Sequence, residues 1–299
     1  MPPQTTRTHF ARLLWLALFW TLAATLPAQA QDAAALKARH AALADSLASN
    51  AFGRPLHMLS SESGSSLAGD IYARIEQPFA VVGPALRGAR NWCDILILHL
   101  NVKRCLASTP PGADSLGLVV GSKHDQAVAD AYAFAFAYRV MAATPDYLQI
   151  QLNAATGPLG TSGYRIVLEV VALDGGRSFL HMSYSYGYGF AARVAMQGYL
   201  ATAGRNKVGF SVVGKRPAGE PIYIAGTRGV IERNTMRYYL AIEAYLDALA
   251  APAAQQLDKR LNAWHAGAER YPTQLHELEL SEYLDMKRGE VQRQRALGG

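Results

Sequence analysis

The hydrophobic pattern of residues 116–213 constrains the fold more than any other feature of this 299-residue chain. Apolar and polar residues alternate there with a period of two, which is typical of half-buried strands. Turn residues interrupt the pattern at short intervals, and links this short join antiparallel strands, because parallel neighbours need a crossover of about a dozen residues or more. The segment therefore predicts an antiparallel meander with strands at 132–138, 147–153, 164–173 and 178–188.

The chain contains two cysteines, Cys93 and Cys105. An even pair in an oxidising compartment favours a disulfide. Bridged Cα atoms lie about 4.4 to 6.8 Å apart, whereas twelve residues span about 18 Å as helix and about 40 Å as strand. A bridge therefore requires the chain to reverse, and we expect the reversal at 99–101. Two free buried thiols are one alternative. A metal site that includes His99 is the other, although it lacks a fourth ligand and the usual Cys-x-x-Cys spacing.

The residues before the meander predict two helical regions and a hairpin. An Ala-rich helix is expected over 32–49, and a Ser/Gly cluster marks the tip of a hairpin over 55–76. Apolar spacing predicts short helices at 79–86 and 91–98, with Asn91 as the N-cap of the second.

After the meander the apolar spacing returns to that of a helix. We expect a helix at 190–203, short strands at 207–213 and 222–225, and a long helix over 227–249 with one apolar stripe. Residues 253–299 are charged and helical in pattern, and they are predicted to form a helical appendage. Its charged residues are expected to be solvated, as for Glu277, Glu279, Lys287 and Arg288.

The first thirty residues predict export. Arg7 and Arg12 precede an apolar run at 13–26, and Ala28-Gln29-Ala30 fits the small-x-small pattern of signal peptidase. Cleavage after Ala30 would leave a periplasmic or secreted protein. The apolar run is shorter than the roughly 20 residues of a membrane span, so no stable span is expected after cleavage.

The charge pattern argues against a nucleic-acid partner. The net charge is +6, and no run of Lys and Arg is longer than two residues. A nucleic-acid surface requires basic residues gathered on one face or along one helix.

The order of these elements resembles the START-like helix-grip (SRPBCC) superfamily. The resemblance rests on the strand at 71–75, the two short helices after it, the meander and the helix that begins at Thr227. It covers residues 68–250 and implies an α+β fold, in which a curved antiparallel sheet wraps a long C-terminal helix around an apolar cavity. The expected organisation is a signal peptide, an N-terminal helix and hairpin strand, the helix-grip-like domain and the appendage: 1–30, 31–67, 68–250 and 253–299.

Two aromatic stripes are the candidate ligand-binding residues. In each stripe aromatic residues alternate with small or polar ones, so they share one face of a strand. Tyrosine combines a large contact area with a polar tip, which suits an apolar ligand with one polar end. Ordinary core packing, or a half-exposed edge strand, would give the same pattern. The stripes are Tyr132, Phe134, Phe136 and Tyr138, and Tyr184, Tyr186 and Tyr188.

Catalytic signals are few. Neither a G-x-S-x-G nor an H-E-x-x-H motif occurs. His181, Glu169 and Arg165 are weak candidates for acid, base and anion clamp, and a cross-strand ion pair explains them equally well. Residues 187–192 match G-x-G-x-x-A, but the preceding strand has the mixed pattern of an antiparallel sheet. We therefore expect no cofactor and no metal.

The leading hypothesis is an exported carrier that binds a hydrophobic small molecule or lipid, as the resemblance implies. One alternative is an enzyme of unknown reaction that uses the same cavity. The other is a periplasmic assembly module whose protein partner binds 253–299.

Overall fold

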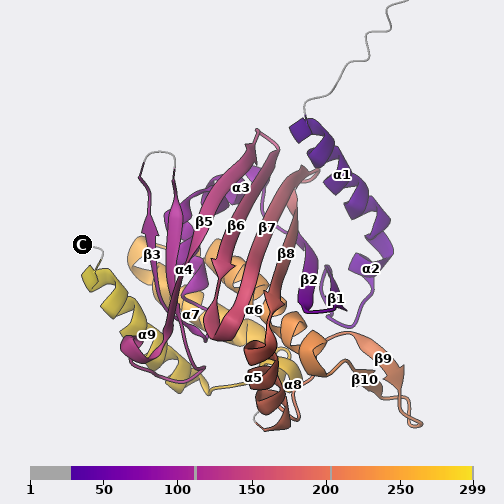
Figure 1. Ribbon diagram of the computed structural model, residues 1–299. Helices are drawn as coiled ribbons and strands as arrows, with labels where there is room; N and C mark the ends of the chain where they lie inside the picture. The colour runs from indigo at the N-terminus through magenta and orange to yellow at the C-terminus, as the bar shows by residue number, and fades with distance from the viewer. Residues whose placement is uncertain (1–27, 111–112, 203, 298–299) are drawn as a thin grey trace, which may run out of the picture.

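The computed structural model describes residues 28–110, 113–202 and 204–297. Eight antiparallel strands form one sheet in the order β1-β2-β8-β7-β6-β5-β4-β3, which confirms the predicted meander (Figure 1). Strands β3 to β8 follow one another along the sheet, and β2 continues it by pairing with β8. The strands are β1 (Leu56–Ser63), β2 (Ser66–Ile75), β3 (Val102–Ser108), β4 (Ser115–Val120), β5 (Tyr132–Ala143), β6 (Tyr147–Thr156), β7 (Thr161–Leu173) and β8 (Arg177–Tyr188).

One face of the sheet packs on the long helix α6 (Gly226–Ala248), so the predicted α+β helix-grip architecture is confirmed. Helices α3 (Phe79–Arg87) and α4 (Ala89–Leu96) cover the rest of this face. Helix α6 comes very close to β2 at Gly69, where a Cβ atom would lie 2.3 Å from the Thr235 hydroxyl oxygen. A larger residue at this position would force Thr235 or the helix itself to move, so glycine permits the close approach.

The opposite face of the sheet carries a second, smaller core. Helices α1 (Ala28–Ala42) and α2 (Ala44–Ala48) pack there through Leu36, Leu43 and Leu47 against Phe179 and neighbouring side chains. The predicted helix at 32–49 is therefore present, with a break at Leu43. The predicted signal peptide lies outside the described residues, except for 28–30.

The chain between β8 and α6 forms a helix and a separate hairpin. Helix α5 (Phe190–Ala201) follows β8 directly. Strands β9 (Val212–Lys215) and β10 (Pro221–Tyr223) pair with each other and lie outside the large sheet. The inserted helix was expected from the sequence. The strand expected at 207–213 is wrong over 207–211, because β9 begins only at Val212, and the strand expected at 222–225 is found at 221–223.

The last three helices pack against the rest of the chain. They are α7 (Ala253–Glu269), α8 (Pro272–Leu275) and α9 (Leu280–Leu297). Helix α7 contacts α6, and α9 lies beside β3 at the edge of the sheet (Figure 1). The expectation of solvated charges is wrong for Glu277, which is largely buried, and for Lys287, which is fully buried. Whether 253–299 folds as a separate unit stays a prediction.

A buried ionic cluster fixes α9 to the edge of the sheet. The Glu290 carboxylate accepts hydrogen bonds from Lys103 Nζ at 3.1 Å and Lys287 Nζ at 2.8 Å, and all three side chains are inaccessible to solvent. Lys287 Nζ also donates to the carbonyls of His99 and Val102 at 2.7 and 2.9 Å. The cluster therefore holds α9 against the turn that leads into β3.

Removing the one carboxylate of this cluster should be costly. We expect Glu290→Gln to lower the free energy of unfolding by about 3 kcal/mol, because two buried ammonium groups lose their counter-ion. Chemical denaturation would measure the loss. Glu282→Gln, which changes an exposed carboxylate on the same helix, is the matched control and should change stability by less than about 0.5 kcal/mol. Equal effects of the two variants would contradict this account.

The structure confirms the disulfide between Cys93 and Cys105, whose Cα atoms lie 5.1 Å apart. It joins α4 to β3, and the chain reverses in the turn between them, as expected.

The prediction that Asn91 caps the second short helix was wrong. Helix α4 begins at Ala89 after Gly88, and the Asn91 side chain instead donates to the Ala85 carbonyl at 2.8 Å.

Reduction of the disulfide should lower the melting temperature by several degrees. A loop of this length contributes about 3 kcal/mol in the chain-entropy model. Cys93→Ser and Cys105→Ser should each lower the melting temperature by the same amount in calorimetry. The double variant should lower it little further, because both substitutions remove the same bond. No change on reduction would show that the bridge does not stabilise this fold.

Candidate functional site

A cavity of about 300 Å³ lies between the α6 face of the sheet and helices α5 and α6. Strands β7 and β8 supply one wall, and α6 supplies the opposite wall with Val230, Arg233 and Tyr238. Helix α5 closes one side through Ala192, Met196 and neighbouring residues. The cavity thus occupies the space that a helix leaves when it spans a curved sheet.

One side of the cavity is a wall of aromatic rings. Tyr164 stacks on Tyr186 with ring centroids 5.1 Å apart, and Tyr184 lies 5.6 Å from Tyr186. Phe134 extends the wall from β5, 5.8 Å from Tyr164. Burial raises the pKa of Tyr184 and Tyr186, so both remain neutral phenols at ordinary pH. The wall therefore presents uncharged aromatic rings to the cavity.

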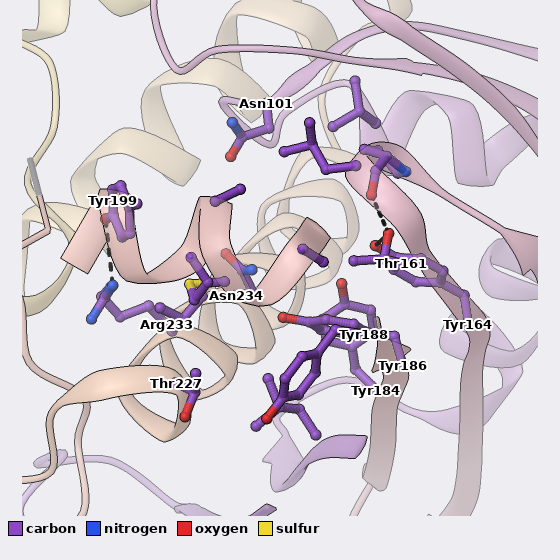
Figure 2. A pocket seen from close by; sticks show the side chains of 18 of the residues that line it. Asn101, Thr161, Tyr164, Tyr184, Tyr186, Tyr188, Tyr199, Thr227, Arg233 and Asn234 are labelled. Atoms are coloured by element: carbon purple, nitrogen blue, oxygen red, sulfur yellow. Dashed lines mark hydrogen bonds between the residues drawn. The ribbon is translucent and has the colours of Figure 1, made fainter. Parts of the chain in front are cut away.

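The other side of the cavity is basic. Figure 2 shows Arg233 and Tyr199 across the cavity from Tyr184, Tyr186 and Tyr188. Arg233 is 1% exposed and donates to the Val208 carbonyl at 3.2 Å and to the Tyr199 hydroxyl at 3.5 Å. Lys123 Nζ also lies 3.3 Å from this hydroxyl. The remaining charged residue of the lining is Arg237, and no Asp or Glu of the described chain belongs to it.

The basic residues share few negative partners. Glu277 accepts from Lys123 at 2.5 Å and from Arg237 at 2.8 Å, and Lys207 lies 3.8 Å from it. Burial raises the pKa of Tyr199, but Lys123 and Arg233 outweigh burial, and the pKa lies below its usual value. The lowered pKa of a half-buried phenol indicates a positive potential at this end of the cavity.

Neutral His99 adds a hydrogen-bond donor here. Burial lowers its pKa well below the usual value, and the surrounding cations lower it further. Nδ1 accepts the backbone N–H of Asn101 at 3.1 Å, so the single ring proton resides on Nε2. Nε2 has no partner in the described structure.

His181 and Glu169 come together on the other face of the sheet. His181 Nδ1 lies 2.8 Å from Glu169, and Nε2 lies 2.9 Å from Asp70. The Tyr72 ring stacks on the imidazole at 4.3 Å, and the Tyr147 hydroxyl donates to Glu169 at 2.6 Å. None of these residues lines the cavity.

Two carboxylates favour the charged form of this imidazole. Burial lowers the pKa of His181, but Asp70 and Glu169 outweigh burial, and the pKa is raised above 6.5. Burial raises the pKa of Glu169, but hydrogen bonds from His181 and Tyr147 outweigh it, and the pKa is lowered. The cluster therefore behaves as a structural ion pair between β2, β7 and β8.

The stability that this cluster supplies should depend on pH. Because the folded-state pKa of His181 is raised, its contribution is fully present below about pH 6.5 and is lost as the pH rises through the raised value. We expect His181→Asn to lower the melting temperature more at pH 6 than at pH 9. His124→Asn, an exposed histidine beside Glu282, is the control and should show little difference. An equal loss at both pH values would argue against a charged His181.

Comparisons with known proteins show similarity in structure at low sequence identity. No protein-family model matches the chain, and no curated protein matches it. Human StAR-related lipid transfer protein 5 is 10% identical over 58% of this chain and 90% of its own, with a TM-score of 0.30. The Zhui aromatase/cyclase of a Streptomyces species is 13% identical over 72% of this chain and 95% of its own, with a TM-score of 0.32. Norcoclaurine synthase from Thalictrum flavum is 14% identical over 48% of this chain and 86% of its own, with a TM-score of 0.31.

The two predicted aromatic stripes have different positions. Tyr184, Tyr186 and Tyr188 of the β8 stripe all line the cavity. In the β5 stripe, Phe134 lines it, whereas Tyr132 is 49% exposed and Phe136 is buried in the core. The Tyr138 hydroxyl donates to the Arg87 carbonyl at 2.7 Å, away from the cavity.

The predicted catalytic set is not assembled at the cavity. In the described residues no hydrogen bond or ion pair joins Arg165 to Glu169 or His181, and Arg165 lies opposite Ser185 and Asn153 in the sheet. The described chain also contains no group of three His, Cys, Asp or Glu side chains placed to hold a metal ion.

Sequence reasoning missed the basic end of the cavity. Arg233, Lys123 and His99 come from α6 and two different turns, so no spacing in the sequence connects them. The one signal in the sequence was the set of charged residues Glu232, Arg233 and Arg237 within the predicted long helix, which the structure shows to be buried.

Proposed function

We propose that this protein is an exported carrier that binds a hydrophobic or lipid-like molecule in the cavity between the sheet and α6. The observation that carries the proposal is the aromatic wall of Tyr164, Tyr184 and Tyr186, which faces an unfilled space of about 300 Å³. Mutual packing of such rings normally fills a core to high density. A space left beside neutral aromatic rings suits an apolar ligand.

The cavity has the size and lining of a small-molecule site. Its volume lies at the lower end of the range of about 300 to 1,000 Å³ that is usual for such sites. Further apolar side chains of the lining come from β4, β5 and α5: Val120, Phe134, Ala192, Ala195 and Met196. These contacts favour a ligand with a compact apolar body.

Export is the second part of the proposal. The predicted signal peptide and the disulfide between Cys93 and Cys105 support it, since disulfides persist in oxidising compartments. Among the described residues, no helix is long and apolar enough to cross a membrane.

The alternative functions have less support. The His181 cluster faces away from the cavity, so the enzyme hypothesis retains no named residue inside it. An assembly module would require an exposed apolar stripe on α7 to α9. Instead, the large apolar side chains of these helices are mostly buried within the chain, including Leu261, Trp264, Leu275 and Tyr283.

A substitution that fills the cavity should prevent binding. N-phenyl-1-naphthylamine is a neutral, apolar probe whose fluorescence rises in an apolar site, and we expect the native protein to bind it. Ala192 is buried and lines the cavity, so Ala192→Trp should weaken probe binding by about tenfold or more. Fluorescence titration would measure both affinities.

The neighbouring substitution Ala191→Trp is the matched control, because Ala191 is exposed and does not line the cavity. It should bind the probe as the native protein does. Mass spectrometry of organic extracts from natively purified protein would then identify the natural ligand. No probe binding, together with no extracted ligand, would refute the carrier function.

A further inference from the structure

The guanidinium of Arg233 is buried in the cavity wall. Within residues 28–110, 113–202 and 204–297 it forms no ion pair, and its Nε has no hydrogen-bond partner. The adjacent Glu232 does not compensate it. That carboxylate is held by the hydroxyls of Ser60 and Ser211 and by the backbone N–H groups of Phe210 and Ser211, at 2.6 to 2.9 Å.

Buried charges without partners are costly, and proteins retain them chiefly where a ligand or reaction requires them. Two other cavity-lining side chains also have unmatched buried N–H groups, Arg237 at Nε and His99 at Nε2. Three cations near this end share the single carboxylate of Glu277. The cavity thus has an excess of positive charge and of hydrogen-bond donors, and none of its described lining residues is acidic.

We propose that the ligand is an amphipathic anion whose carboxylate binds at Arg233 and Lys123, while its apolar body lies against the wall of Tyr164, Tyr184 and Tyr186. This inference rests on the proposed carrier function and specifies the ligand class. Figure 2 shows Arg233 on one side of the pocket and Tyr184 and Tyr186 on the other, with Asn234 between them. A guanidinium offers paired N–H donors that match a carboxylate, and charge-assisted hydrogen bonds of this kind are short and strong.

Dodecanoate and 1-dodecanol provide a matched test, because they share an apolar chain and differ in the charge of the head group. The measurement is displacement of N-phenyl-1-naphthylamine from the native full chain at pH 8. Each competing ligand is used below the concentration at which that ligand aggregates. We expect dodecanoate to bind about tenfold or more tightly than dodecanol. Acetate, the head group without a chain, should not displace the probe at the same concentrations. Displacement by acetate would indicate a site for a free anion and would overturn the proposal.

Arg233→Met should reduce the preference for dodecanoate to less than about threefold, because it removes the charge and keeps an apolar side chain of similar length. Arg228→Met makes the same change on the same helix, at a residue that donates to Ser60 and does not line the cavity. It should retain the full preference. A preference that survives Arg233→Met would overturn the assignment to this residue.

The melting temperature of the ligand-free variant separates binding from structure. If Arg233 serves a ligand, Arg233→Met should melt at or above the native temperature, since a buried unpaired charge is removed. A lower melting temperature with an unchanged preference would show a structural role. The comparison of dodecanoate with dodecanol on the native protein decides the ligand class even if the variant fails to fold. Equal binding of the two would refute the anionic ligand alone, whereas binding of neither would refute the carrier function.

Discussion

The alternation of side chains along β8 governs the arrangement of the whole molecule. This strand pairs with β2 on one side and β7 on the other, so its register fixes two separate surfaces. Tyr184 and Tyr186 face α6 and the cavity, whereas His181 faces the opposite surface, where α1 also packs. A shift of one residue would exchange these sets, placing a charged ion-pair cluster in the cavity and the aromatic wall in solvent. The register is therefore a condition for both the core and the candidate site.

Much of the fold could be predicted because it depends on local periodicity. The strands from β5 to β8 and the helix α6 follow from periods of 2 and 3.6, and the disulfide from the even cysteine count. The β8 stripe was placed at the cavity for the same reason. Of the β5 stripe only Phe134 reaches the cavity, because the same face of this strand continues from the cavity lining into the core at Phe136 and Tyr138.

The remainder depends on contacts between distant segments, which periodicity does not reveal. Lys287 and Glu290 look like surface charges on a polar helix, and their burial becomes evident only when β3 brings Lys103 to them. Glu277 likewise meets Lys123 across more than 150 positions of sequence. The same contacts position the candidate site, since the ionic cluster supports the turn that carries His99 and Asn101 into the cavity lining.

Gly69, which does not line the cavity, sets the distance between α6 and β2 beside it. Thr235 and Ile231 of α6 pack directly on the backbone of β2 there, because Gly69 has no side chain to separate the helix from the sheet. Gly69 lies opposite Tyr184 in the pairing of β2 with β8, and Leu67 of the same strand lines the cavity, so this close contact lies next to the tyrosine wall. A larger residue at position 69 would hold the helix further from the sheet, so the width of the cavity depends on a residue that does not line it.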